Sequence, residues 1–525
     1  MRILTNAQIF TLDPRQPQAS EIALEDGKVL AVGTNLSQTA RSGVAVEDMG
    51  GRVILPGLID AHIHLKQYAF NLTKIDCETS TKQACLDRVH EQAEHTPPGQ
   101  WIFGHGWNQN QWQGEFGTAV ELDQAAPRNP VYLTAKSLHA GWANSLALEK
   151  AGIRKKTSDP EAGKISRTSE GEPDGVLFEN AMLLVEKVLP EPTRAAVVEA
   201  LLQGQEPLWK MGLTGVHDFD RRQCFAALQT LQSRGELKLR VLKQVHHTNF
   251  KQALQLGLQS GFGGPRLSIG GAKFFSDGAL GPQTAALLAP YQGQATRGIP
   301  LLNQESLEEI GRKAVDGGLS LSVHAIGDSA NRLVLNALEA IRKYEQMHGL
   351  SPFRHRIEHV QLLHPKDLHR LAALDIIASM QPIHATSDME TAERFWGDRC
   401  RYAYAWKSQL LQGARLAFGS DAPVESPNPF WGIHAAVTRR RRDGTPGPCG
   451  WIPEERLSTR EALEAYTKGA AYAAGWENQA GKLAPGFWAD LIILDQNPFT
   501  IDPEQLHTLR PVGTIFAGTF VWRDF

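Results

Sequence analysis

The segment LPGLIDAHIHL, residues 55–65, places two histidines one residue apart at the end of an apolar run, His62 and His64. Alternate residues of a strand point to the same side, so both imidazoles leave this segment in one direction. Imidazole nitrogens are ligands for zinc and for other divalent ions of similar character. The spacing therefore makes a metal centre the first hypothesis for this chain.

Four more residues suited to metal chemistry follow strand-like segments further along the chain: Lys273, His324, His359 and Asp421. Lys273 stands among small and apolar residues, where burial disfavours its ammonium form. A neutral amine can bind a cation, and it can react with carbon dioxide to form a carbamate with two oxygens. Each histidine alone also fits a hydrogen-bonded structural residue. The shared position of all six at strand ends favours the metal centre.

The elements that would position these residues are eight strand-like segments. They lie near residues 53–61, 214–219, 238–246, 268–276, 319–324, 355–361, 376–382 and 414–421. Helix-like stretches separate them, which predicts a parallel sheet. Eight such units favour an α/β fold of the (β/α)8 TIM barrel type over an open doubly wound sheet. Barrel enzymes carry their catalytic groups at the carboxyl ends of the strands, where the six residues fall.

Two further regions surround the barrel in this prediction. Residues 1–52 and 480–525 are rich in short strands and are expected to pair as one composite β domain, a small β-sandwich. The barrel would then span residues 53–479. About 150 residues separate its first two strands, too many for a structureless loop, so residues 66–212 or thereabouts are expected to form a subdomain inserted after strand 1.

Composition narrows the class of protein. The formal net charge is −3 and 42% of the residues are hydrophobic, which gives no reason to expect nucleic acid as a partner. The five cysteines are scattered and never form a CxxC pair, which argues against a disulfide framework and a thiolate zinc site. No apolar run reaches the length of a membrane span. We expect a cytoplasmic enzyme, as a homodimer, with no membrane partner.

The ordered motifs resemble the amidohydrolase superfamily, and more narrowly its amidohydrolase 3 branch, which includes the N-substituted formamide deformylases. They are PGLIDAHIHL, GGAKFFSDGALG, SVHAIGDSAN, RIEHVQLL, SMQPIHATSD, AFGSDAPVESPNPFWGIHAAV and GKLAPGFWADLIILD. The resemblance implies a binuclear centre in which His62 and His64 hold the more buried ion. A carbamate on Lys273 would bridge to a second ion held by His324 and His359. Asp421 would ligate the first ion and act as the general base.

The resemblance implies hydrolysis of a non-peptide carbon–nitrogen bond by a metal-activated hydroxide, with a small amide, N-acyl amine or N-formyl amine as substrate. Zinc is the expected ion, as one or two per chain, with manganese, iron and cobalt left open. The first alternative is a mononuclear deaminase of the same superfamily. A glutamate after the strand 5 histidine, as in HxxE, would favour it, but the segment here is HAIGD. The second alternative is a non-catalytic barrel scaffold.

Residues expected to contact the substrate come from two regions. The inserted segment supplies Trp107, from the aromatic stretch GHGWNQNQWQ, and His139. Packing in the core of the insertion is the competing interpretation for the tryptophan. The end of the seventh strand and the residues beyond it supply Gln381, His384 and Asp388.

Overall fold

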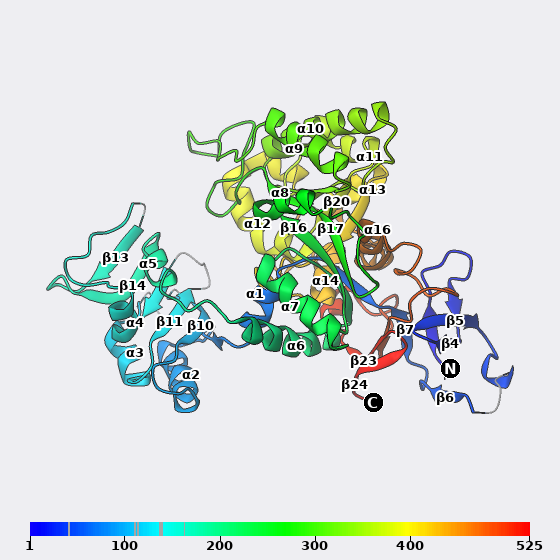
Figure 1. Ribbon diagram of the computed structural model, residues 1–525, viewed down its shortest axis with the longest axis horizontal. Helices are drawn as coiled ribbons and strands as arrows, with labels where there is room; N and C mark the ends of the chain where they lie inside the picture. The colour runs from blue at the N-terminus through cyan, green and yellow to red at the C-terminus, as the bar shows by residue number, and fades with distance from the viewer. Residues whose placement is uncertain (40–42, 110–111, 113–114, 136–139, 162) are drawn as a thin grey trace. The chain divides into compact units, whose positions relative to one another are not determined.

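Eight parallel strands form one sheet in the middle of the chain in the computed structural model of the protein (Figure 1). The structure describes residues 1–525 except 40–42, 110–111, 113–114, 136–139 and 162. Consecutive strands are neighbours throughout this sheet. In chain order they are β8 (Leu58–Ile63), β15 (Leu213–Asp218), β16 (Arg240–His246), β17 (Leu267–Phe275), β18 (Leu321–Ala325), β19 (Arg356–His359), β20 (Ile377–Met380) and β21 (Arg415–Phe418).

The sheet closes between its last strand and its first. Ile63 and Ala422 form a parallel bridge, and the backbone N–H of Asp421 donates to the carbonyl of His62 at 2.7 Å. Closure of eight parallel strands confirms the predicted (β/α)8 barrel and excludes the open doubly wound sheet.

Helices follow the strands and cover the outside of the barrel (Figure 1). Their amphipathic pattern explains this position: α10 (Asp328–Met347) buries Val334, Leu335, Leu338 and Ile341, which share one helical face. Other helices of this layer include α7 (Arg222–Ser233), α8 (Phe250–Gln255), α9 (Gln304–Asp316), α11 (Arg370–Ala373), α12 (Pro382–Trp396), α13 (Trp406–Leu411), α14 (Pro429–Thr438), α15 (Thr459–Glu464) and α16 (Ala470–Ala474).

Both ends of the chain build a second, smaller region from two sheets. The first sheet contains β1 (Arg2–Thr5), β4 (Glu21–Glu25), β5 (Lys28–Gly33) and β6 (Ala45–Asp48). The second contains β2 (Gln8–Phe10), β3 (Gln18–Ala19), β7 (Val53–Pro56), β22 (Leu491–Leu494), β23 (Pro511–Phe516) and β24 (Thr519–Arg523). Apolar residues of both sheets share one buried core, which includes Leu4, Ile22, Ile54 and Ile493.

The segment predicted as one strand over residues 53–61 is divided in two. Val53–Pro56 pairs with β2 and β22 in the β-sandwich, and the barrel strand begins only at Leu58. The boundary of the composite β region therefore lies at about residue 56 and not at residue 52. Gly57 joins the two strands where a Cβ atom would lie 2.2 Å from Oγ1 of Thr214, so the crossing requires glycine.

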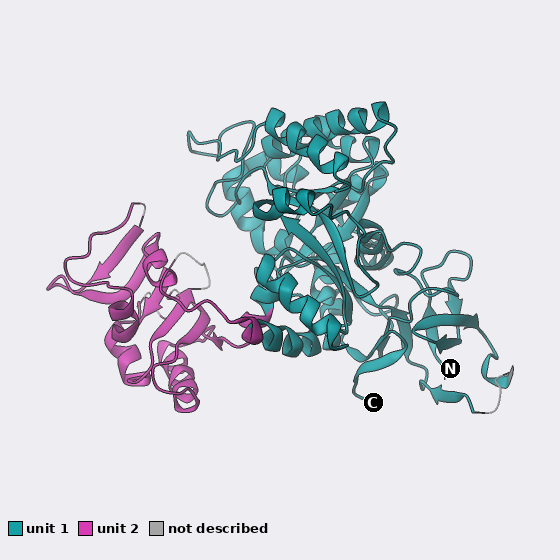
Figure 2. Ribbon diagram, viewed as in Figure 1, with its two compact units in different colours: residues 1–68, 197–525 teal, residues 69–196 magenta. Residues whose placement is uncertain are grey.

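Residues 69–196 form a separate compact unit, shown in magenta in Figure 2. Its six-stranded mixed sheet contains β9 (Ile75–Asp76), β10 (Ile102–Trp107), β11 (Val131–Ala135), β12 (Ala140–Ala143), β13 (Gly163–Arg167) and β14 (Pro173–Glu179). The helices α2 (Lys82–His95), α3 (Ala119–Ala125), α4 (Ser145–Lys150) and α5 (Met182–Glu186) belong to the same unit. Most of α6 (Arg194–Lys210) belongs to the unit that contains the barrel, so the insertion is shorter than the predicted 66–212.

Among the residues that the structure describes, no helix is both long enough and apolar enough to cross a membrane. All five cysteines are free thiols, and four of them are buried.

Candidate metal centre

The six residues proposed as metal ligands come together at the carboxyl ends of five barrel strands. They line one cavity of about 340 Å³. His62 lies on β8, Lys273 on β17 and His359 at the end of β19. His64 directly follows β8, and Asp421 lies three residues after the end of β21. His324, on β18, completes the set. The structure thus collects in one place residues that lie up to 359 positions apart in the sequence.

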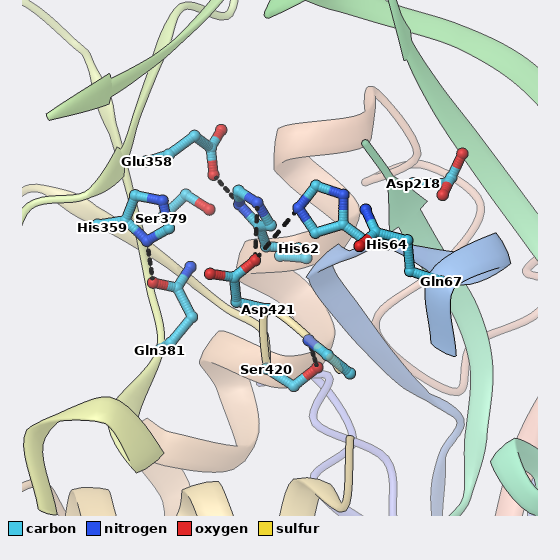
Figure 3. Close-up of polar contacts among 12 residues, drawn as sticks. His62, His64, Gln67, Asp218, Glu358, His359, Ser379, Gln381, Ser420 and Asp421 are labelled. Atoms are coloured by element: carbon cyan, nitrogen blue, oxygen red, sulfur yellow. Dashed lines mark hydrogen bonds and ion pairs between the residues drawn. The ribbon is translucent and has the colours of Figure 1, made fainter. Parts of the chain in front are cut away.

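Asp421 lies between the two histidines of the HxH pair (Figure 3). Its Oδ1 is 3.4 Å from Nε2 of His62 and 3.4 Å from Nε2 of His64. Both rings therefore face the same carboxylate, as expected for alternate residues of a strand. The other nitrogen of His64 lies 3.7 Å from Oδ1 of Asp220.

A second pair of histidines faces the same cavity. The ring centroids of His324 and His359 are 4.5 Å apart, and those of His62 and His359 are 5.1 Å apart. Donor atoms of His62, His359 and Asp421 lie within 4.8 Å of one another, close enough to share one cation. His359 and Asp421 have left-handed backbone, with φ of 76° and 60°. Such strain is uncommon outside glycine and clusters at functional sites.

Hydrogen bonds fix which nitrogen of three rings is free to bind a ligand. Nδ1 of His62 lies 2.8 Å from a carboxylate oxygen of Glu358, and Nδ1 of His359 lies 2.8 Å from Oε1 of Gln381. Nε2 of His324 lies 2.9 Å from the carbonyl oxygen of Gly278. Because these partners accept hydrogen bonds, each ring nitrogen that meets them carries the proton. The opposite nitrogen keeps its lone pair for a cation.

Burial and neighbouring charge set the protonation of the cavity. Burial lowers the pKa of Lys273 to about 8, and its Nζ has no hydrogen-bond partner among the described residues. Burial lowers the pKa of His62 to about 4, which keeps this ring neutral at neutral pH. Burial alone would raise the pKa of Asp421, but His62 and His64 outweigh it and hold this pKa well below its usual range. Burial lowers the pKa of His64, but Asp220 and Asp421 outweigh it and raise this pKa to about 9. The six converging residues therefore offer three neutral imidazoles, the imidazolium of His64 and one ionised carboxylate.

Several residues that sequence reasoning did not identify hold these groups in place. Asp60 accepts hydrogen bonds from the backbone of His62 at 2.9 Å and from the backbone and hydroxyl of Ser420 at 3.0 and 2.5 Å, so it joins β8 to the segment after β21. The ring of Phe219 stacks on His62 with centroids 3.8 Å apart. Charged residues inside strands that are buried on both faces were the available signal for Asp60 and Glu358.

The five predicted substrate contacts have different positions. Gln381 holds His359, whereas His384 and Asp388 line the cavity. The hydroxyl of Tyr404 donates to Asp388 at 2.5 Å.

Trp107 is 1% exposed in the core of the inserted unit and donates to the carbonyl of Leu133, a position that argues against a substrate contact. The core interpretation fits it better, because its ring packs on two further tryptophans, Trp112 and Trp142. His139 lies outside the described residues.

A second acidic cluster, Asp218, Asp220 and Cys224, also has metal-ligand types within reach of one another. Nζ of Lys243 lies 2.8 Å from Oδ2 of Asp218, so a resident ammonium already balances this cluster. The cluster is a buried ion pair that supports the start of α1 (Leu65–Asn71), since Asp218 accepts a hydrogen bond from the backbone of Leu65.

The fold and the cavity together define an enzyme of the (β/α)8-barrel hydrolase class. The sequence model of the Amidohydrolase family matches residues 45–522. The chain belongs to the amidohydrolase family.

Individual relatives match over nearly the whole chain. YtcJ of Bacillus subtilis is 35% identical over 98% of this chain and 98% of its own length. The N-substituted formamide deformylase of Arthrobacter pascens is 29% identical over 98% of this chain and 97% of its own length. Among solved structures, a metal-dependent hydrolase from Pyrococcus horikoshii superimposes with a TM-score of 0.80 at 29% identity, over 96% of this chain and 99% of that one. These matches confirm the predicted family and fold.

Proposed function

We propose that the protein is a metal-dependent amidohydrolase that cleaves a non-peptide carbon–nitrogen bond in a small N-acyl or N-formyl amine. The observation that carries the proposal is the cavity itself, where the six proposed ligands, which are four imidazoles, one carboxylate and one buried amine, meet. The match to an N-substituted formamide deformylase along almost its whole length supports the substrate class.

The residues present fit a pair of divalent ions. Nζ of Lys273 is buried without a hydrogen-bond acceptor among the described residues, an arrangement that disfavours an ammonium group. His62, His64 and Asp421 would hold one ion, and His324 and His359 the other. Lys273, as a carbamate, would be a ligand shared by the two ions. Bound divalent ions, zinc by expectation, supply Lewis acidity that activates water and polarises a carbonyl group.

Asp421 is the residue we assign to proton transfer. It is the one carboxylate among the six converging groups, and the two neighbouring imidazoles keep it ionised. An ionised carboxylate beside the reacting water accepts its proton and then returns that proton to the leaving amine. The backbone at Asp421 is left-handed, and the neighbouring Ser420 is hydrogen-bonded to Asp60 of β8. Together these features fix the direction of the Asp421 side chain.

The rest of the cavity favours an uncharged, partly apolar substrate. Phe275, Leu280, Ile326 and Val424 supply apolar walls, and His384 and Asp388 supply polar ones. Among the described lining residues there is no arginine, and Lys273 is the one lysine. A polyanionic substrate would therefore lack cationic partners.

The deaminase alternative has less support in this cavity. The aspartate of the HAIGD segment, Asp328, is 4% exposed and accepts a hydrogen bond from the backbone of Leu288 at 2.9 Å. It therefore serves the loop and the start of α10. Lys273, which a single-ion site does not need, lines the same cavity as the proposed histidine ligands.

Two measurements test the proposal together. Elemental analysis of protein purified without chelators from zinc-supplemented cells should give about two equivalents of metal per chain. A panel of N-formyl and N-acetyl arylalkylamines should release amine, and a chelator should stop the release until metal is added back. Metal-loaded protein that cleaves no member of the panel would contradict the substrate class. Protein that binds no metal would contradict the centre itself.

A further inference from the structure

In His62, His359 and His324, the ring nitrogen that carries the proton donates to an acceptor, and the three acceptors differ in charge. The contacts have nearly equal lengths, 2.8, 2.8 and 2.9 Å, so charge and not distance distinguishes them. The acceptors are the carboxylate of Glu358 for His62, the amide oxygen of Gln381 for His359 and the backbone carbonyl of Gly278 for His324. Oδ1 of Asp277 lies farther from the same nitrogen of His324, at 3.5 Å, and accepts a hydrogen bond from the backbone of Ile326. At distances below 3 Å, His62 is thus backed by an anionic acceptor, and His359 and His324 by neutral acceptors.

Arg356 contacts both oxygens of Glu358, including the one that meets His62, and so holds this carboxylate in place beside the ring. Nε of Arg356 lies 2.5 Å from one oxygen of Glu358, and its Nη2 donates to the other at 3.0 Å. The same guanidinium donates to the carbonyl of Ala61 at 2.7 Å and to the hydroxyl of Ser379 at 2.5 Å, and it lies 2.8 Å from Nδ1 of His217. Arg356 is 1% exposed and connects four strands of the barrel interior.

The charge of the acceptor changes the strength of the ligand. A carboxylate that accepts the Nδ1 proton of an imidazole fixes the tautomer and raises the basicity of Nε2, which makes Nε2 a better donor to a cation. A neutral amide or carbonyl fixes the tautomer with a smaller gain in basicity. Arg356 balances the total charge of Glu358, but the oxygen that meets His62 remains an anionic acceptor.

We propose that Glu358 and Gln381 are positioning residues that set unequal metal affinities in the two halves of the centre. The ion held by His62, His64 and Asp421 binds more tightly than the ion held by His324 and His359, so the two ions load in that order. This inference rests on the binuclear centre of the proposed function. Asp421 adds negative charge to the tight half as well, so only substitutions behind the ligands isolate the effect of Glu358 and Gln381.

Two reciprocal substitutions test the inference, Glu358→Gln and Gln381→Glu. Nε2 of Gln381 has no hydrogen-bond partner among the described residues, so an oxygen in its place removes no existing contact. Metal-free protein is titrated with Zn²⁺ against a chromophoric chelator to obtain both dissociation constants, and with Co²⁺ to record the visible bands of each step. Glu309→Gln, on the exposed face of α9, changes the net charge by the same amount as Glu358→Gln and is the matched control.

The natural protein should show two steps separated by about tenfold or more. Glu358→Gln should weaken the tight step by about 10- to 100-fold and shift its Co²⁺ bands, with the weak step unchanged. Gln381→Glu should tighten the weak step by a similar factor. Glu309→Gln should change neither step, which separates a positioning effect from a change in net charge.

Other results overturn the inference. Two equal steps in the natural protein, or an unchanged tight step in Glu358→Gln, would exclude a role of Glu358 in metal affinity. If Glu358→Gln does not fold, Gln381→Glu decides the question. An unchanged weak binding step in Gln381→Glu would contradict the inference that the charge of the acceptor sets metal affinity. Absence of metal binding in the natural protein would instead contradict the proposed function.

Discussion

His62 and Asp421 contact each other twice at the point where the barrel closes. The backbone N–H of Asp421 donates to the carbonyl of His62 at 2.7 Å, and their side chains face each other at 3.4 Å (Figure 3). The contact that closes the barrel thus also brings the first of the proposed ligands to the residue that we propose as the general base. A shift of either segment would change the fold and the centre together.

Asp421→Asn should separate proton transfer from metal binding. The amide keeps the size of the carboxylate and an oxygen for coordination, but it cannot accept a proton at neutral pH. Turnover should fall by about 100- to 10,000-fold while most of the metal remains bound. Elemental analysis and amine release measure the two effects, with the exposed Asp443→Asn as control. Retained turnover would remove Asp421 from the role of base.

Lys273→Met should remove the ligand that the two proposed ions share. Methionine fills a similar volume but forms no carbamate, so metal content should fall from about two equivalents to about one. Turnover should fall by at least about 100-fold. Natural protein reconstituted in carbonate-free buffer should regain activity only after bicarbonate is added, and the variant should not respond. Full metal content in the variant would exclude the bridge.

Asp490→Asn should destabilise the junction between the barrel and the β-sandwich. Both carboxylate oxygens of Asp490 accept hydrogen bonds from Nε and Nη2 of Arg240, and one of them also accepts from the backbone of Ala517 at 2.8 Å. Breaking one partner of a buried pair leaves the other uncompensated, which costs about 3 kcal/mol. Asp495→Asn removes an exposed pair with Arg52 and should cost less than about 1 kcal/mol. Urea unfolding of both variants measures the two losses of unfolding free energy. Equal losses would contradict a structural role of the buried pair at this junction.

Stability should fall between pH 6.5 and 4, in part through His434. Burial first, and then His507, Arg440 and Arg442, lower the pKa of His434 to about 4, whereas Glu504 lies 4.0 Å away. An unfolded histidine has a pKa of about 6.5. Between these values the unfolded state binds more protons, so the contribution is complete above pH 6.5 and is lost as the pH falls towards 4.

His434→Gln removes this titration. The difference in unfolding free energy between pH 7 and pH 5 should shrink by about 1 to 2 kcal/mol, the linkage expected when the pKa of a buried histidine is lowered from 6.5 to about 4. The measurement is urea unfolding at both values of pH, compared with His369→Gln, a substitution of an exposed histidine. An identical pH dependence in His434→Gln and the natural protein would exclude the contribution.

Local pattern was sufficient for the barrel and for the ligand-type residues. The eight strands are short buried runs between amphipathic helices, and His62, Lys273, His324 and His359 stand on or at the ends of these runs, so their meeting follows from the topology. The division at Gly57 was not predictable, because Val53–Pro56 and Leu58–Ile63 form one apolar run, and only the pairing of the first with β22 separates them.

The contacts that the supporting residues make could not be predicted, for a related reason. Glu358 reaches His62 across the barrel from a strand 296 positions later, and Asp60 reaches Ser420 across 360 positions. No local period encodes such contacts, which depend on which side chains fill the interior of the closed barrel. Trp107 was misinterpreted for a different reason. The aromatic and polar stretch GHGWNQNQWQ is typical of a surface loop, but its Trp107 lies in the core of the inserted unit.

The division of the chain at Gly57 has a consequence for biosynthesis. The strand before this glycine pairs with β22, and the strand after it closes against the segment that follows β21. Both partners leave the ribosome more than 350 residues after the HxH segment. The HxH segment is therefore synthesised long before the segments that become its neighbours. The proposed metal centre can assemble its ligands only after Asp421 has been synthesised, so its maturation follows translation of the barrel.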